Sequence, residues 1–106
     1  MGTTECIACS YKSLPTTVNV GSTIYAADGN LTLEVTELGD DFVNVICKNG
    51  IKLGEKKNMN LPGAVVDLPT LTPQDEKDIV DFGIPTGIDF IAASFVRKAA
   101  DVDYIR

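Results

Sequence analysis

Hydrophobic and polar residues alternate along the first half of the chain, as they do in β-strands that bury one face. Three short runs rich in apolar and β-branched residues carry this pattern: 23–26, 31–36 and 42–48. In residues 31–36 the alternation places Leu31, Leu33 and Val35 on one face. The pattern predicts an antiparallel structure of short strands in this half of the chain.

Turn-forming residues separate these runs. The Asp-Gly-Asn triplet at 28–30 predicts a hairpin, and the Gly-Asp-Asp triplet at 39–41 predicts a second turn. The Asn-Gly pair at 49–50 is a strong hairpin signal and predicts a further strand at residues 51–53. Short strands at this spacing suggest a small antiparallel barrel or sandwich over residues 5–61.

The second half of the chain changes from strand signals to helix signals. Thr72 predicts a helix N-cap, with Pro73 at the first helical position and Asp75 completing a capping-box-like pair. The helix is expected over residues 74–82, and Gly83 is expected to end it.

The last part of the chain has the pattern of an α/β architecture. Residues 88–93 are almost continuously apolar, like a strand that is buried on both faces in a parallel sheet. Residues 98–106 carry apolar side chains at helical spacing. The predicted fold is mainly β. It has a small antiparallel β-barrel in residues 1–63 and a partial α/β segment in residues 64–106, formed by a helix, a strand and the start of a helix.

Length and charge narrow the possible functions. The 106 residues allow one ordinary domain but no complete (β/α)₈ barrel, which needs roughly 250 residues. The net charge of -6 repels nucleic acid and anionic membranes, so neither is expected as a partner. No apolar run reaches the roughly 20 residues of a transmembrane helix and no signal peptide is recognisable, so a soluble, cytoplasmic protein is expected.

The three cysteines allow a redox or a structural interpretation. Cys6 and Cys9 have C-x-x-C spacing, and Cys47 stands alone. The chain has no histidine and no second cysteine pair, so a four-ligand zinc site lacks soft ligands. If residues 5–11 form a strand, as we expect, the first two cysteines point to opposite faces and are buried, reduced thiols. A redox role would require them to react as a pair under mild oxidant.

Several motifs occur together in an order that resembles the pyruvate kinase family. In the second half they are KKNMNLPG at 56–63, VDLPTLT at 66–72 and SFVR at 94–97. In the first half, YKSL at 11–14, GSTI at 21–24 and ADG at 27–29 are looser echoes of the lid domain of that family. The resemblance covers the chain from about Ser10 to Arg106.

The resemblance implies an enzyme that transfers the phosphoryl group of phosphoenolpyruvate to ADP in glycolysis, giving pyruvate and ATP. The family uses Mg²⁺ (or Mn²⁺) and usually K⁺, and the full-length enzyme is expected to be a homotetramer. Its lid is inserted between a strand and a helix of the catalytic (β/α)₈ barrel. The resemblance therefore implies a lid domain followed by a partial TIM-barrel segment.

Three residues match contacts of the family, and each has a structural alternative. Lys57 matches the lid lysine that meets the nucleotide phosphates, or is a solvated turn lysine. Asp28 matches the lid aspartate near the metal–nucleotide complex, or serves only its Asp-Gly turn. Ser94 would end a barrel strand, where the corresponding serine lies close to the monovalent cation, or is only a small residue at that position.

Other charged residues near these motifs are expected to be structural. Arg97 has two potential ion-pair partners, Asp67 and Asp101. Asp67 either lies at the hinge joint or, flanked by two apolar residues, accepts hydrogen bonds from nearby backbone N–H groups, which we expect.

The family's catalytic centre has no counterpart in these motifs. The strands that carry its arginine and asparagine, its Lys-x-Glu motif and its metal-binding aspartate are not found, so no catalytic residue or metal ligand is expected here. We expect a fragment of pyruvate kinase that is inactive alone. Its residues 88–95 are expected to be exposed, to pair with a second copy of the chain, or to cause aggregation. The alternative is a stand-alone β-barrel module that binds a nucleotide or a protein, with its tail folded back onto the barrel.

Overall fold

The structure is a computed structural model that describes residues 2–106. The chain divides into two compact units, one ending at Val66 and the other running from Asp67 to Arg106. Each unit is described by itself below.

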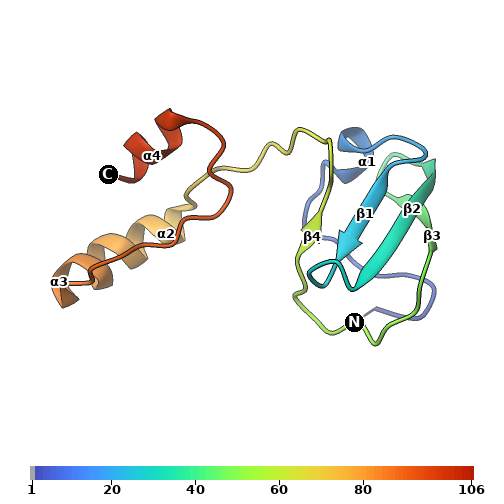
Figure 1. Cartoon of the computed structure of the whole chain (residues 1–106), viewed down its shortest axis with the longest axis horizontal. Helices are drawn as coiled ribbons and strands as arrows, with labels where there is room; N and C mark the ends of the chain where they lie inside the picture. Colours follow the sequence, from blue (N-terminus) through green and yellow to red (C-terminus); the bar gives the residue numbers. More distant parts are fainter. Residues whose placement is uncertain (1) are drawn as a thin grey trace. The chain divides into compact units, whose positions relative to one another are not determined.

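The first unit is built around an antiparallel sheet. Its elements are α1 (Leu14–Thr17), β1 (Thr23–Ala26), β2 (Leu31–Leu38), β3 (Val43–Cys47) and β4 (Met59–Asn60). The strands lie in the order β3-β2-β1-β4, as Figure 1 shows, and each neighbouring pair is antiparallel. Antiparallel pairing is as predicted. Among the described strands no pairing joins β3 to β4, so the sheet is open. A β4 of two residues offers too few backbone groups to close a barrel.

One face of this sheet forms the core of the first unit. The buried hydrophobic residues are Val18, Ile24, Ala26, Leu31, Leu33 and Val35. The predicted alternation along β2 is confirmed, because Leu31, Leu33 and Val35 are all buried whereas the residues between them are more exposed. Met59 and Leu61 pack against the same cluster, so β4 adds to the core.

The prediction of a strand at residues 5–11 is wrong. No strand is assigned there, because the Thr3 hydroxyl accepts hydrogen bonds from the backbone N–H groups of Glu5 (3.2 Å) and Cys6 (3.0 Å) and turns the chain. The prediction of buried thiols is also wrong. Cys6, Cys9 and Cys47 are all free and exposed.

The predicted hairpin at Asn49-Gly50 does not form, and residues 51–53 are not a strand. The Asn49 side chain instead bonds to the backbone at the start of β2. It accepts from the Thr32 N–H (2.9 Å) and donates to the Asn30 carbonyl (2.6 Å). After Asn49 the chain has no strand until Met59, where β4 pairs with β1.

The second unit begins with the predicted helix, which is longer than expected. It runs through α2 (Pro73–Lys77), a π-helical turn η1 (Asp78–Gly83) and α3 (Ile84–Thr86), drawn as one continuous coil in Figure 1. The capping box between Thr72 and Asp75 is confirmed. The helix ends at Gly87, which adopts the left-handed conformation (φ 67°), and not at Gly83.

The π-helical turn has a local cause in Pro85. In a regular α-helix the proline ring collides with the carbonyl four residues earlier. The Ile84 N–H donates to the Ile79 carbonyl, five residues back, so the turn is widened by one residue just before the proline. Sequence periodicity counts 3.6 residues per turn and does not register this widening.

The predicted buried strand at residues 88–93 is not formed in this structure. The segment is extended but unpaired, and Phe90 is 93% exposed. A strand needs backbone partners on its edges, and none of the described residues supplies one here. The predicted helix–strand–helix segment of a (β/α)₈ barrel therefore lacks its strand in this structure. The helix that follows, α4 (Ala99–Ile105), is as predicted. No helix in residues 2–106 is long and apolar enough to cross a membrane.

Candidate functional site

Asp28 lies at the tip of the β1–β2 hairpin. Asp28 and Gly29 both have positive φ (58° and 84°), and the Asn30 N–H donates to the Ala27 carbonyl (3.2 Å), which closes the tight turn. Aspartate and glycine tolerate this conformation better than other residues do. The Asp28 side chain is exposed, and no hydrogen bond or ion pair of the described residues engages it.

Lys57 lies two residues before β4, after a left-handed residue at Lys56 (φ 54°). Its ammonium group is exposed and has no ion-pair or hydrogen-bond partner among residues 2–106. Glu55, two residues earlier, therefore does not neutralise the charge of Lys57. An unpaired ammonium remains able to bind an anion.

The register of the sheet brings Asp28 and Lys57 to one place. In the β1–β4 ladder Tyr25 pairs with Asn60 and Ala26 with Met59. One step further along, the Ala27 N–H donates to the Asn58 carbonyl (3.0 Å). Asp28 and Lys57 are the next residues beyond this bond, so both lie at the same end of the ladder. The backbones of two residues 29 positions apart in the sequence thus meet at one end of the ladder, and no ion pair joins their exposed side chains.

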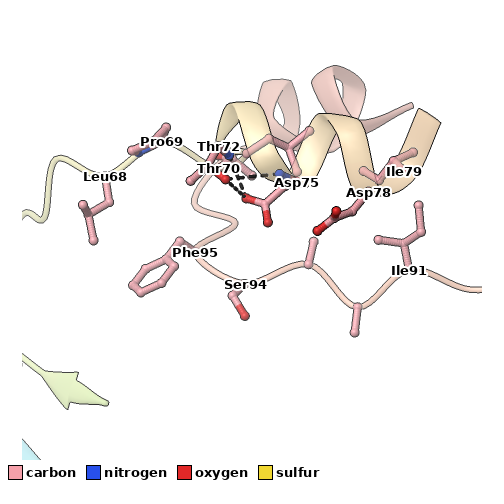
Figure 2. Close-up of a pocket in the computed structure, with 13 residues that line it drawn as sticks. Leu68, Pro69, Thr70, Thr72, Asp75, Asp78, Ile79, Ile91, Ser94 and Phe95 are labelled. Atoms are coloured by element: carbon pink, nitrogen blue, oxygen red, sulfur yellow. Dashed lines mark hydrogen bonds between the residues drawn. The ribbon is translucent and has the colours of Figure 1, made fainter. Parts of the chain in front are cut away.

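Ser94 belongs to the second unit, where it lines a groove of about 410 Å³ between the helix and the extended segment. The lining residues are Leu68, Pro69, Thr70, Leu71, Thr72, Asp75, Asp78, Ile79, Ile91, Ala92, Ala93, Ser94 and Phe95. Figure 2 shows the Ser94 hydroxyl directed away from the helix, while the Asp75 carboxylate turns toward Thr72. The groove is mainly apolar, and its serine has no partner among the described residues.

The two carboxylates of this groove are already engaged. Asp75 accepts hydrogen bonds from the Thr72 N–H and hydroxyl (both 2.7 Å), and this bonding holds the pKa of the Asp75 carboxyl below its usual range. Asp78 accepts from the Gln74 amide (2.8 Å). Both carboxylates therefore already bind groups at the start of the helix.

A network around Arg97 was only partly predicted. The Arg97 guanidinium donates to the Leu68 carbonyl (2.7 Å). Asp101 was predicted as an ion-pair partner, but it bonds to the backbone, accepting from the N–H groups of Arg97 (2.9 Å) and Lys98 (3.2 Å). These bonds hold the pKa of the Asp101 carboxyl below its usual range. The four-residue spacing of Arg97 and Asp101 indicates that these two residues interact. Nothing in the sequence indicates that Arg97 binds the Leu68 carbonyl.

The described residues offer no group of three or more carboxylate, thiol or imidazole side chains that could hold a metal ion. Asp28 supplies one carboxylate and Ser94 one hydroxyl, each without a second ligand from its own unit. These side chains do not by themselves fit a divalent-cation site, which needs several oxygen ligands.

The family model described as "Pyruvate kinase, barrel domain" matches residues 1–106. The chain is 55% identical over 106 residues to a pyruvate kinase of Eimeria tenella and 50% identical over 107 residues to the cytosolic isozyme of Glycine max. It is also similar to a solved structure of Cryptosporidium parvum pyruvate kinase in complex with ADP, at 50% identity and a TM-score of 0.93.

The matches cover all or nearly all of this chain: 100% for the Eimeria tenella relative, 99% for Glycine max and 100% for the Cryptosporidium parvum structure. They cover only 20%, 21% and 21% of those proteins respectively, so the chain spans about a fifth of their length. The sheet, the helix and the extended segment thus correspond to one part of much longer pyruvate kinases. The chain belongs to the pyruvate kinase family.

Proposed function

We propose that this chain supplies the nucleotide lid and the adjoining barrel segment of a pyruvate kinase. That enzyme would transfer the phosphoryl group of phosphoenolpyruvate to ADP, giving pyruvate and ATP. The observation that carries the proposal is the convergence of Lys57 and Asp28 at one end of the β1–β4 ladder, with both side chains exposed and unpaired. The solved relative in complex with ADP supports a nucleotide as the ligand of this edge.

Lys57 is proposed to bind the nucleotide phosphates. Phosphoryl transfer depends on positioning and on neutralising charge on the phosphate oxygens. A lid that carries an unpaired ammonium brings one such charge to the nucleotide when it closes, and it excludes water at the same time. The left-handed Lys56 and the bond between Ala27 and Asn58 fix the backbone on either side of Lys57, so the ammonium extends from a defined point.

Asp28 is proposed to lie near the metal–nucleotide complex, and Ser94 near the monovalent cation. The full enzyme would use Mg²⁺ (or Mn²⁺) and K⁺, which offset the charge on the phosphates when bound. Because one carboxylate and one hydroxyl do not make a cation site, the principal metal ligands are proposed to lie in other parts of the enzyme. A homotetramer in the cytoplasm is proposed for the full enzyme, in line with the relative named as a cytosolic isozyme.

The exposed tail favours this proposal over a stand-alone binding module. A self-contained module would cover the apolar residues of 88–95, yet Phe90 is 93% exposed and Phe95 57% exposed. An apolar segment of this kind is typical of a piece whose neighbours come from the rest of a barrel.

The test is a chimeric enzyme. The matching fifth of the Eimeria tenella pyruvate kinase is replaced by this chain, and ATP formation from phosphoenolpyruvate and ADP is measured. The chimera is expected to be active. Lys57→Ala is expected to lower kcat/KM for ADP by at least about tenfold, since it removes a charge at the phosphates. Lys52, an exposed lysine five residues earlier, provides the matched control. The kcat/KM of Lys52→Ala for ADP is expected to stay within about twofold of the unsubstituted chimera.

Two outcomes would contradict the proposal. An inactive chimera that folds would remove the phosphotransferase role, and equal effects of the two lysine variants would remove the phosphate role of Lys57. The 106-residue chain alone is expected to bind MgADP weakly. Binding tighter than about 1 µM that Lys57→Ala abolishes would show that the chain carries most of the site itself.

A further inference from the structure

The Arg97 guanidinium holds the backbone at the point where the chain enters its second unit. The first unit ends at Val66, and Leu68 is the second residue of the unit that follows. The Leu68 carbonyl accepts a 2.7 Å hydrogen bond from Arg97 Nη2, across 29 positions of sequence. A bond from a charged donor to a backbone carbonyl is stronger than a neutral one and fixes the carbonyl in both distance and direction.

Arg97 is itself held rigidly by the next helix. Asp101 is 8% exposed and is the buried charged residue of the described chain. Its Oδ2 accepts from the backbone N–H groups of Arg97 (2.9 Å) and Lys98 (3.2 Å), as the cap of α4. The Arg97 side chain that binds the Leu68 carbonyl therefore extends from a backbone that is itself hydrogen-bonded to α4.

The same segment carries the candidate site serine. Ser94 lies three residues before Arg97, and Phe95 between them has a positive φ (58°), which bends the chain. The contact to Leu68 thus links the entry into the second unit with the segment that bears Ser94. Both ends of this link lie within the second unit.

We propose that Arg97 is a positioning residue that anchors the base of the lid hinge by holding the Leu68 carbonyl. The role rests on the proposed function, because it concerns the lid that carries Lys57. Lid closure requires a few joint residues to absorb changes in φ and ψ. With Leu68 fixed, those changes are confined to the residues before it, and Lys57 closes along one path toward the nucleotide. Without this hydrogen bond the changes in φ and ψ are spread over more residues, and the Lys57 ammonium is positioned less precisely.

The contact itself is tested on the 106-residue chain by NMR of the arginine side chains. Arg97 is expected to show separate, slowly exchanging Nη–H signals, because one Nη donates to a fixed carbonyl. Arg106, at the end of α4, is the internal control and is expected to show averaged signals. Averaged signals for both arginines would overturn the anchor.

The role in positioning is tested in the chimeric enzyme described above. Arg97→Ala is expected to lower kcat/KM for ADP about tenfold, while KM for phosphoenolpyruvate changes less than about threefold. Arg97→Lys keeps a charged donor and is expected to recover part of the loss. Arg106→Ala is the matched control and is expected to leave both parameters unchanged.

The outcomes separate the two proposals. If the unsubstituted chimera is active and Arg97→Ala matches Arg106→Ala, the hinge role is wrong and the proposed function stands. If Arg97→Ala lowers melting temperature and affects both substrates equally, with no recovery in Arg97→Lys, its role is structural and the hinge role is wrong. If the unsubstituted chimera folds but is inactive, the proposed function fails and this role fails with it.

Discussion

At Asn49 a side-chain amide makes the backbone hydrogen bonds that a neighbouring strand would otherwise make. It accepts from the Thr32 N–H (2.9 Å) and donates to the Asn30 carbonyl (2.6 Å). Asn49→Ala is expected to lower the free energy of unfolding of the first unit by about 1–2 kcal/mol, because two backbone groups lose partners. Urea unfolding measures this. Asn44→Ala is the control, since it removes one exposed bond to Glu37 and is expected to cost less than about 0.5 kcal/mol. Equal costs would contradict the interpretation.

Two aspartates in the second unit make helix stability depend on pH. The pKa of Asp75 and that of Asp101 are both held below the usual range by hydrogen bonds to the carboxylate. A carboxyl whose pKa is lower when folded stabilises the folded state above its unfolded pKa of about 4, and this contribution is lost as pH falls through the folded pKa. Far-UV circular dichroism is therefore expected to show helix loss as pH falls below about 4.

The variants identify the groups that titrate. Asp75→Asn and Asp101→Asn together are expected to remove most of the pH dependence of the helical signal, because an amide does not ionise. Asp103→Asn, an exposed position in α4, is the control and is expected to retain the unsubstituted profile. A double variant that still lost its helix over the same pH range would show that other groups are responsible.

At the scale of elements, Gly87 decides where the long helix ends. Its φ of 67° is unfavourable for a side chain with a Cβ atom. Gly87→Ala is expected to lower the stability of the helical unit by about 1 kcal/mol, measured by urea unfolding followed by the helical signal. Gly50→Ala is the control, because Gly50 has no positive φ and no atom within 4 Å of an added Cβ. It is expected to change stability by less than about 0.5 kcal/mol.

Elements whose stability is local were predictable from the sequence. The alternation along β2, the Asp28-Gly29 turn and the Thr72–Asp75 capping box depend on residues within a few positions of one another. The hairpin predicted at Asn49-Gly50 was wrong, because the Asn49 side chain bonds to the backbone of Asn30 and Thr32, a non-local contact that a turn signal does not reveal. The π-helical turn depends on how the helix relieves a steric conflict at Pro85, which periodicity does not reveal.

For the candidate site, the sequence motifs point to residues but not to their arrangement. Lys57 and Asp28 were singled out by the motifs around them. Their meeting at one end of the β1–β4 ladder depends on a non-local register, which the two-residue β4 could not signal in advance. The hold of Arg97 on the Leu68 carbonyl depends likewise on tertiary contact, since any residue at position 68 presents the same carbonyl.

At the scale of the whole molecule, the extended segment after Gly87 leaves apolar side chains without cover. Phe90 is 93% exposed, and Ile88, Ile91 and Phe95 are 46–57% exposed. This chain matches only about a fifth of the length of its relatives. In those longer proteins, other residues are available to cover such a segment. In the 106-residue chain, the unpaired backbone and apolar side chains favour contact with a second copy.

This exposure predicts self-association that a single substitution weakens. Phe90→Asp is expected to weaken association of the 106-residue chain by at least about tenfold, because burying a phenylalanine contributes roughly 1.5–3 kcal/mol and a buried unpaired carboxylate costs more. Sedimentation velocity over a concentration series measures the change. Phe42→Asp, at a 50% exposed position in the first unit, is the control and is expected to leave association unchanged. If both variants weaken association equally, the contact is a general apolar one. If neither does, the extended segment does not drive association, and the neighbours that a barrel would supply are not needed to keep this chain monomeric.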